Sequence, residues 1–186
     1  MNDNIALHLL AASHRDNSVN RKLLLYAGEI MASHGAILTN HHYGVFDLPL
    51  YNDQLRTENG LPEAAHIAAE LLRPADAILL AVPEYNWSYP ASIKNIIDWF
   101  SCMQPSPLRG KAVFLMCATP SERGGIMCLS HLKTVLEYMG MWVYPLVFGL
   151  GKESEQWEGN KLIPKQHKLL ASQLGGYNDF CKKIIG

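Results

Sequence analysis

The sequence predicts a single α/β domain in which a parallel β-sheet is covered by helices on both faces. The chain has 186 residues, of which 48% are hydrophobic and 18% charged, so a domain of this length can bury a continuous core. Short apolar runs alternate with longer segments of helical period, which is the pattern of successive βαβ units. Two of these runs, 76–82 and 111–118, are almost entirely apolar, as expected of strands buried on both faces.

The first part of the chain is expected to hold a strand, a helix and an edge strand. Residues 5–12 form an apolar run that predicts the first strand. The polar segment 13–18 then leads into a helix predicted from 20 to 33. Residues 36–45 mix polar and apolar side chains, which indicates a second strand at the edge of the sheet.

The next segment, 47–60, is polar, contains Pro49 and predicts a long loop. A helix is expected over 62–72, because Pro62 suits the first helical turn. The third strand, 76–82, is stopped by Pro83 and is expected to be central in the sheet.

The second half of the chain repeats the alternation. A helix is predicted over 90–103, and the strand 111–118 is followed by another helix and by a fifth strand over 141–148. A polar loop, 150–160, precedes the closing helix, 164–185. The inward-facing residues predicted for these helices are Ile93, Ile96, Ile97, Phe100, Ile126, Leu129, Leu132, Leu136, Met139, Leu170, Leu174, Tyr177 and Ile184.

Five strands and five helices in strict alternation predict a flavodoxin-like three-layer sandwich over residues 1–186. Its five-stranded parallel sheet has the order 2-1-3-4-5, with helices on both faces and right-handed crossovers. Ligands bind such sheets beyond the carboxyl ends of the strands, where strands one and three diverge. The candidate site therefore comprises the loops 13–20, 83–89 and 119–125.

Composition excludes several classes of partner and localisation. With 16 Lys and Arg against 17 Asp and Glu, there is no basic excess for binding nucleic acid. The apolar runs are too short for a membrane span, and the first residues lack the basic region of a signal peptide, so the mature chain is expected to start near Met1. Four widely spaced cysteines fit reduced thiols in the cytoplasm rather than disulfides or zinc.

The first loop has the composition of an anion site. Unpaired N–H groups at the start of a helix attract an anion, the hydroxyls of Ser13 and Ser18 are donors, and Arg15 offers a planar guanidinium suited to a phosphate monoester. The dinucleotide and P-loop glycine patterns are absent, which argues against Rossmann binding and an NTPase. Alternatively, Ser18 merely caps the helix and Arg15 is a solvated surface charge.

The other two loops are compatible with a flat ligand but are less specific. In 83–90, Tyr85 and Trp87 can stack on a ring or pack against another subunit. The alternative is a structural turn in which Asn86 or Ser88 caps the next helix. In the third loop, Gly124 and Gly125 allow close backbone approach to a ligand, although glycine pairs are also ordinary turn residues.

Two motifs together resemble the NADPH-dependent FMN reductase family, which includes flavin, quinone, azo-dye and chromate reductases. The first motif combines Ser13, Arg15 and Ser18 with the segment 20–23, and the second runs from Pro83 to Trp99. The resemblance covers about residues 5–148. It implies that the FMN phosphate is held by Ser13, Arg15, Ser18 and Asn20. It implies isoalloxazine contacts from Pro83, Glu84, Tyr85, Asn86 and Ser88.

The sequence departs from the family pattern in two places. Ala12 precedes Ser13 where the family usually has glycine, a small change where the backbone tolerates a Cβ. The family's third loop is glycine-rich, whereas Thr119 and Pro120 begin it here, and proline cannot donate an N–H. The resemblance still carries over a flavin contact at Gly124 and Gly125, while Glu122 and Arg123 are alternative candidates for the subunit interface.

The resemblance implies an FMN-dependent NAD(P)H oxidoreductase with bound FMN and with NADPH or NADH as the hydride donor. Electrons would pass by ping-pong hydride transfer to a small-molecule acceptor: a quinone, an azo compound, free flavin or a metal oxyanion. No catalytic side chain is required, because the flavin N5 carries the chemistry. The alternatives are a flavodoxin-like electron carrier, a flavin-binding regulator, or a degenerate member that has lost flavin binding through the change at Thr119 and Pro120.

The resemblance also implies a homodimer or homotetramer formed through the helix 90–103. Lys94, Asp98 and Trp99 would then be interface residues rather than catalytic ones. No metal site is expected, since His41 and His42 are adjacent in a predicted strand and point to opposite faces.

Four further residues have a predicted place. His14 is beside Arg15 and would add charge to the phosphate site at low pH. Cys117 lies within a predicted buried strand and is expected in the core. Trp142 and Trp157 are expected to be packing residues.

Overall fold

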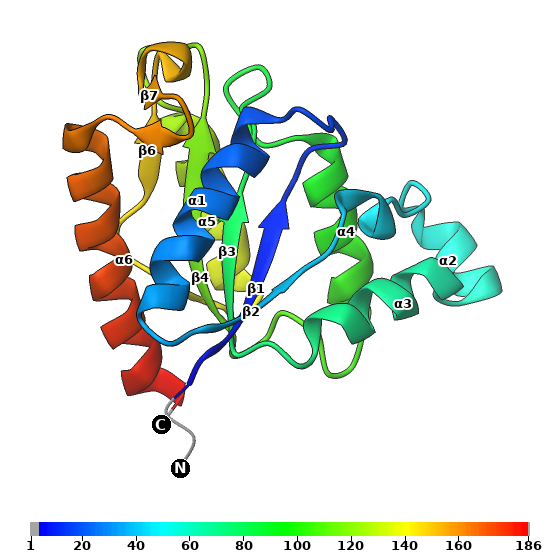
Figure 1. Ribbon diagram of the computed structural model, residues 1–186. Helices are drawn as coiled ribbons and strands as arrows, with labels where there is room; N and C mark the ends of the chain where they lie inside the picture. The colour runs from blue at the N-terminus through cyan, green and yellow to red at the C-terminus, as the bar shows by residue number, and fades with distance from the viewer. Residues whose placement is uncertain (1–3, 186) are drawn as a thin grey trace.

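The computed structural model, which describes residues 4–185, contains a parallel β-sheet with helices on both faces (Figure 1). The strand order is β2-β1-β3-β4-β5, and β6 pairs with β4 beyond the end of β5. All of these pairings are parallel, so the predicted flavodoxin-like sheet of order 2-1-3-4-5 is confirmed. The strands are β1 (Ala6–Ala11), β2 (Ile37–Asn40), β3 (Ala77–Ala81), β4 (Ala112–Ala118), β5 (Trp142–Val143) and β6 (Phe148–Leu150).

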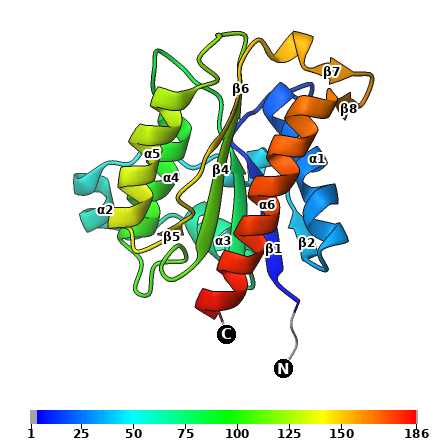
Figure 2. The same ribbon diagram turned by 90° about the vertical axis from the view of Figure 1, so that its left-hand side faces the viewer.

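The helices form the outer layers of the sandwich. Figure 2 shows α1 and α6 on one side of the sheet and α4 and α5 on the other. A short helix, α2, lies outside this second layer (Figure 1). The α-helices are α1 (Val19–Ser33), α2 (Asp53–Asn59), α3 (Glu63–Leu72), α4 (Ala91–Ser101), α5 (Ile126–Tyr138) and α6 (Pro164–Ile185).

The core consists of two apolar clusters, one on each face of the sheet. Successive side chains of a strand point to opposite faces, so Phe114 of β4 packs with α1 and α6, whereas Leu115 packs with α3, α4 and α5. The stripe predicted for the helix over 90–103 is confirmed, because Ile93, Ile96, Ile97 and Phe100 are all buried. Ile126 is an exception among the predicted inward residues, because it lies in the first turn of α5 and is exposed.

Strand register brings the candidate loops together. Ala11 of β1 lies opposite Ala81 of β3, which in turn lies opposite Met116 of β4. The Ala12 N–H donates to the Ala81 carbonyl at 2.8 Å, so this pairing continues one residue past β1. The carboxyl ends of the three central strands therefore meet at one edge of the sheet, where α1 begins and opposite the two chain termini (Figure 1).

Two segments in the first half differ from the sequence predictions. The strand predicted over 36–45 ends at Asn40, and a 3-10 helix, η1 (Tyr43–Phe46), replaces its second half. The ring of His42 accepts the Gly44 N–H and starts this turn, which buries Tyr43 and Phe46. The loop predicted over 47–60 contains α2, whose first turn is capped by the Asn52 side chain accepting from the Leu55 N–H at 3.1 Å.

The segment 141–162 contains more short elements than the sequence predicts. The single strand expected over 141–148 is split into β5 and β6, with Pro145 between them, because proline has no N–H for the ladder. The loop expected over 150–160 holds a 3-10 helix, η2 (Glu153–Glu155), and most of a hairpin of β7 (Trp157–Glu158) and β8 (Lys161–Leu162).

The two tryptophans near this region have different environments. Trp157 packs as predicted, with Tyr26 at its edge and the Lys22 ammonium 4.0 Å from its ring centroid. Trp142 is 55% exposed because it begins the short edge strand β5, so its predicted packing role is wrong. Among the helices of residues 4–185, none combines the length and apolar character needed to cross a membrane.

Candidate functional site

A cavity of about 250 Å³ lies at the carboxyl ends of β1, β3 and β4. It is walled by the three loops predicted from the sequence and by the start of η2. The sequence-predicted residues that line it are Ser13, Arg15, Ser18, Asn20, Pro83, Glu84 and Tyr85. The lining residues that were not predicted to bind are Asn17, Val19, Ala118, Thr119, Pro120 and Glu153. Asn86, Ser88, Gly124 and Gly125 are not among the lining residues.

The loop before α1 presents donors to this cavity. Ser18 caps the helix, since its Oγ accepts the Arg21 N–H at 3.4 Å, and the Oγ of Ser13 accepts the Arg15 N–H at 3.4 Å. In each case the hydroxyl hydrogen remains able to donate. The capping role suggested for Ser18 is therefore real and compatible with a ligand contact. First-turn N–H groups of α1 and the positive end of its dipole face the same region.

Arg15 supplies the positive charge of this loop. Its side chain is exposed and lines the cavity, and within residues 4–185 it forms no ion pair. His14 is different, because its Nε2 lies 3.7 Å from Asp47 Oδ1 and its ring stacks edge-on against Tyr43. The imidazole of His14 is thus directed toward the Asp47 carboxylate, which would be the partner of a protonated His14.

Asn20 has a structural task in the same region. Its side-chain Nδ2 donates to the Ala118 carbonyl at 2.9 Å, and its Oδ1 accepts the Ala118 N–H at 2.8 Å. Asn20 is only 2% exposed, so this pair fixes the start of α1 against the end of β4. Each end of the amide thus makes one hydrogen bond to Ala118, which leaves the second Nδ2–H and the backbone N–H of Asn20 as the donors that a ligand can use.

The second loop folds into a tight turn at its tip. Tyr85 and Ser88 exchange backbone hydrogen bonds of 2.8 and 3.0 Å, and the central residues Asn86 and Trp87 have φ of 50° and 66°. Positive φ at both central residues is the geometry of a type I′ turn, which is uncommon for tryptophan. The turn holds Tyr85 and Trp87 at the surface, 52% and 55% exposed.

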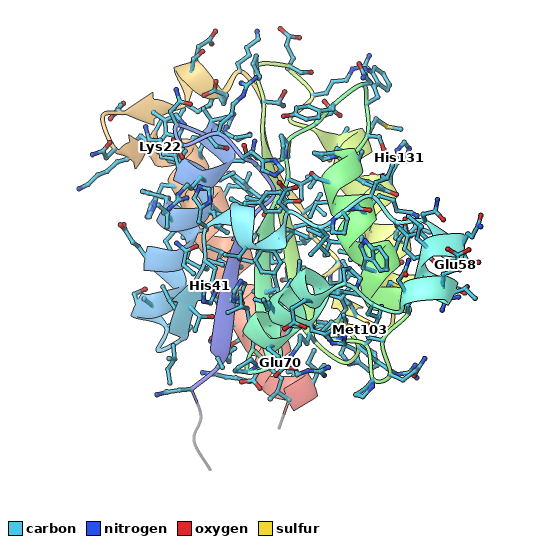
Figure 3. All side chains as sticks on the ribbon, turned by 90° about the vertical axis from the view of Figure 1, so that its right-hand side faces the viewer. Lys22, His41, Glu58, Glu70, Met103 and His131 are labelled. Atoms are coloured by element: carbon cyan, nitrogen blue, oxygen red, sulfur yellow. The ribbon has the colours of Figure 1, made fainter. Side chains whose placement is uncertain are left out.

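Ser88 and Asn86 do not serve as the helix caps suggested as the alternative to a ligand contact. Neither caps α4, which begins after Pro90 without a side-chain cap. Ser88 Oγ lies 3.4 Å from Nδ1 of His131 on α5, so it ties the second loop to the outer helix layer, where Figure 3 labels His131.

Two thiols lie beneath the second loop. Cys117 is buried, as predicted, and Cys128 Sγ donates to the Pro83 carbonyl at 3.7 Å. Burial raises the pKa of Cys128 to about 12 and raises the pKa of Cys117 further. Both thiols are therefore protonated at neutral pH and act as packing groups rather than nucleophiles.

The glycines of the third loop are required for packing. Gly124 has a φ of 62°, and a Cβ there would lie 2.8 Å from the carbonyl carbon of Gly149 in β6. Gly125 has a φ of 73°, and its Cβ would overlap Sγ of Cys117. The loop is also held by the Thr119 N–H, which donates to Leu150 at 3.0 Å. Close packing against β6 and β4 thus explains both glycines without a ligand.

Glu153 is a lining residue that sequence reasoning missed. Its N–H donates to the Thr119 carbonyl at 3.2 Å, which places η2 against the third loop. The sequence offers only a polar segment here. Glu153 reaches the cavity because β6 pairs with β4, so that the segment after β6 lies beside the loop that follows β4.

Near β1 and β2, the buried His8 forms a ring stack with the half-buried His41. His41, labelled in Figure 3, lies beyond β2. Its ring stacks on that of His8, with centroids 5.3 Å apart. His42 points elsewhere, with Nε2 3.6 Å from Asp16 Oδ1. Between residues 4 and 185, no group of three His, Cys, Asp or Glu side chains has a metal-binding arrangement.

The residues predicted at a subunit interface separate into two groups. Lys94 and Asp98 form an exposed ion pair on α4, with Nζ 2.6 Å from Oδ1. Trp99 is 4% exposed, and its Nε1–H donates to the Pro49 carbonyl at 2.7 Å. The prediction for Trp99 is wrong, because its ring is buried inside the protomer by the segment before α2.

A second hollow, of about 520 Å³, runs along α1 beside the β7–β8 hairpin and includes Lys22, labelled in Figure 3. It is larger than the cavity described above but more open to solvent. Lys22 is already engaged there by the Gly159 carbonyl at 3.0 Å and by the ring of Trp157. The convergence of strand ends, a helix start and an unpaired arginine occurs only at the smaller cavity within the described chain.

Comparison with known proteins agrees with this geometry. The sequence model of the family described as NADPH-dependent FMN reductase matches residues 5–155. A quinone reductase of Escherichia coli K12 is 31% identical over 148 residues, covering 75% of this chain and 77% of that protein. An NAD(P)H-dependent FMN reductase of Pseudomonas aeruginosa is 28% identical over the full length of both chains.

A solved structure gives the same picture in three dimensions. The flavoenzyme FerB of Paracoccus denitrificans, an NAD(P)H:(acceptor) oxidoreductase, superposes with a TM-score of 0.82 at 26% sequence identity. The match covers 96% of this chain and 98% of FerB.

Proposed function

The chain belongs to the NADPH-dependent FMN reductase family, and from this premise we propose that it is a quinone reductase that binds FMN in the cavity at the carboxyl ends of β1, β3 and β4. The observation that carries the proposal is the meeting of Arg15, Ser13 and Ser18 with the start of α1 at one wall of this cavity. The exposed ring of Tyr85 stands at another wall.

The donor set fits the two ends of FMN. A phosphate monoester needs charge-assisted and neutral donors converging from one side, which the Arg15 guanidinium, two hydroxyls and the first-turn N–H groups of α1 supply. A flat heteroaromatic ring needs an apolar or aromatic wall, which Tyr85 and Pro83 supply. Glu153 also lines the cavity, and a carboxylate is suited to accepting hydrogen bonds from the hydroxyls of a sugar-like chain.

When bound, FMN would supply the redox chemistry, in which a hydride from NAD(P)H and later two electrons and two protons for a quinone pass through its ring. The protein's own residues bind and orient. Arg15 and the hydroxyls hold the phosphate, the Asn20–Ala118 pair fixes the helix start that carries them, and the type I′ turn sets the position of Tyr85. No side-chain nucleophile is needed, and the buried thiols nearby are protonated.

Quinone is the acceptor favoured here because the relatives of higher identity bear that name. Azo compounds, free flavin and metal oxyanions are the alternative acceptors. A single face shared by donor and acceptor gives ping-pong kinetics.

We also propose that two protomers associate through the exposed face of α4. Lys94 and Asp98 lie on this face, and Leu50 is 82% exposed on the neighbouring segment before α2. Light scattering after gel filtration tests this: a dimer or tetramer that dissociates in a Leu50→Asp variant is expected, and a monomer at micromolar concentration contradicts it.

The function is tested by the visible spectrum of the purified protein and by anaerobic addition of NADPH. A flavin spectrum that bleaches rapidly and returns on adding a quinone is expected. Bound FMN that NADPH bleaches only slowly would point to an electron carrier or flavin-binding regulator. Failure to bind FMN after reconstitution would show that the third loop, with Thr119 and Pro120, no longer supports the cofactor.

A further inference from the structure

Arg123 and Trp87 join the two loops that wall the cavity. Trp87 is two residues beyond Tyr85, and Arg123 is three residues beyond Pro120, and both of those neighbours line the cavity. The Arg123 guanidinium lies over the indole of Trp87, with Cζ 4.7 Å from the ring centroid. The pair therefore connects the second and third loops beside the cavity, although neither residue is among those that line it.

The backbone conformation of each loop positions Trp87 and Arg123. Trp87 occupies the second central position of the type I′ turn with a φ of 66°, a conformation that an ordinary surface tryptophan avoids. The Arg123 N–H donates to Ser121 Oγ at 3.3 Å, and the next two residues are the left-handed glycines packed against β6 and β4. The turn chemistry of both loops thus presents a stacked guanidinium to solvent at a fixed place.

The charge of Arg123 is not neutralised. Within residues 4–185 it forms no ion pair, while the adjacent carboxylate of Glu122 is paired with Lys152. An arginine held over an aromatic ring by a cation–π contact can still donate from its planar N–H fork to an anionic oxygen pair. Arg15, the unpaired arginine that lines the cavity, lies on the first loop, where it serves the proposed phosphate site.

We propose that Arg123, stacked on Trp87, is a specificity residue that binds an anionic group on the molecule that reacts at the cavity. The ligand chemistry is a phosphate, sulfonate or carboxylate attached to a redox-active small molecule. Two sources carry such a group: the ribose phosphate that distinguishes NADPH from NADH, and an acidic substituent on the electron acceptor. The proposal rests on the proposed function, because it names the charge of the substrate for that same site.

The test compares Arg123→Gln with the wild type, using ligand pairs that differ by one anionic group. Calorimetry on the FMN-loaded protein measures the Kd of NADP⁺ and of NAD⁺. Steady-state kinetics with NADH measure KM for 1,4-naphthoquinone and for its 2-sulfonate. Lys152→Gln is the matched control, since it removes the same charge from the neighbouring segment, where the ammonium is already paired with Glu122.

Loss of one charge-assisted contact weakens the anionic member of a pair about tenfold and leaves its neutral partner unchanged. A change confined to NADP⁺ assigns the anion to the hydride donor, and a change confined to the sulfonate assigns it to the acceptor; each supports the proposal. Trp87→Ala should give a smaller change in the same direction, because the guanidinium loses its support but keeps its charge.

Three results overturn the proposal. One is that Arg123→Gln leaves both anionic ligands unaffected. Another is that it weakens NAD⁺ or the neutral quinone as much as their anionic partners, and the third is that Lys152→Gln has the same effect. In all three the wild type still binds FMN and oxidises NADH, so the proposed function survives. If the wild type binds no FMN, both the role of Arg123 and the proposed function are contradicted.

Discussion

The side-chain amide of Asn20 forms a two-way hydrogen-bonded pair with the backbone of Ala118, donating to its carbonyl at 2.9 Å and accepting from its N–H at 2.8 Å. Asn20 is in the first turn of α1, and Ala118 is the last residue of β4, so the pair joins two elements 98 residues apart in sequence. It sets the distance between the loop that carries Arg15 and the loop that begins at Thr119.

Asn20→Ala is expected to destabilise the fold by about 2–4 kcal/mol, because it leaves a buried N–H and a buried carbonyl of Ala118 without partners. Urea unfolding measured by circular dichroism gives this value. Asn59→Ala, at an exposed position of α2, should change stability by less than about 0.5 kcal/mol. Equal stabilities of the two variants would show that the Asn20 pair contributes nothing.

This pair also shows which parts of the protein can be predicted from sequence. The helix over 90–103 is predictable because its apolar stripe is local, and β3 and β4 are predictable because their runs are continuously apolar. The partner of Asn20 is not, since a hydrogen bond across 98 residues leaves no periodic signal. The residue itself matches the family motif, but the motif does not indicate that its side chain pairs with Ala118.

The errors in secondary structure have similar causes. Residues 36–45 mix polar and apolar side chains as an edge strand would, yet over 43–46 the His42 cap and the burial of Tyr43 and Phe46 favour a 3-10 turn. In the segment after β5, Pro145 interrupts the ladder, and only the parallel pairing of β6 with β4 restores it. That pairing also brings Glu153 to the cavity, which a polar loop in the sequence does not indicate.

Arg15→Gln should weaken FMN binding by roughly 10- to 150-fold, the equivalent of one charge-assisted hydrogen bond of about 1.5–3 kcal/mol. The side chain is exposed and makes no ion pair with the described residues, so the melting temperature of the FMN-free protein should not change. Quenching of flavin fluorescence on titration measures the Kd. Arg56→Gln, on α2, is the matched loss of charge far from the cavity; comparable weakening by both variants would contradict a phosphate contact at Arg15.

Gly125→Ala should cost far more than the same change at Gly159. Both glycines have left-handed φ, 73° and 61°, but a Cβ at Gly125 meets Cys117 whereas one at Gly159 meets nothing within 4 Å. The left-handed conformation alone costs about 1–2 kcal/mol for alanine. Overpacking adds about 1–3 kcal/mol at Gly125.

Unfolding free energies in urea separate these contributions. Adding Cys117→Ala to Gly125→Ala removes the overlapping Sγ, so the double variant should be destabilised by less than the sum of the single changes. Equal costs at Gly125 and Gly159, or strict additivity in the double variant, would show that the third loop can move away from β4.

His8 should make the folded state sensitive to mild acid. It is fully buried in β1, with Nδ1 3.0 Å from Thr39 Oγ1 and its ring stacked on His41. Burial, reinforced by His41 and Lys111, lowers the pKa of His8 from 6.5 to about 4. Between these two values the unfolded chain holds a proton that the folded chain does not, so stability falls as the pH falls.

At about 1.4 kcal/mol per pH unit, this single group should remove roughly 2 kcal/mol of stability between pH 6.5 and pH 5, and about 3 kcal/mol by pH 4. His8→Asn keeps a polar group toward Thr39 but does not titrate. Between pH 6.5 and pH 4 the variant should therefore lose about 3 kcal/mol less stability than the wild type. Chemical denaturation of both proteins at several pH values measures the difference.

His34→Gln is the control, since His34 is exposed after the last turn of α1 and its loss should leave the acid sensitivity intact. Other titrating groups act equally in the wild type and in His8→Asn, so they cancel when the two curves are subtracted. A difference that stays flat from pH 6.5 to pH 4 would mean that His8 gains its proton as readily in the folded protein as in the unfolded chain. The stacked pair with His41 would then have to open to water without unfolding, and hydrogen exchange at the β1–β2 edge would report that opening.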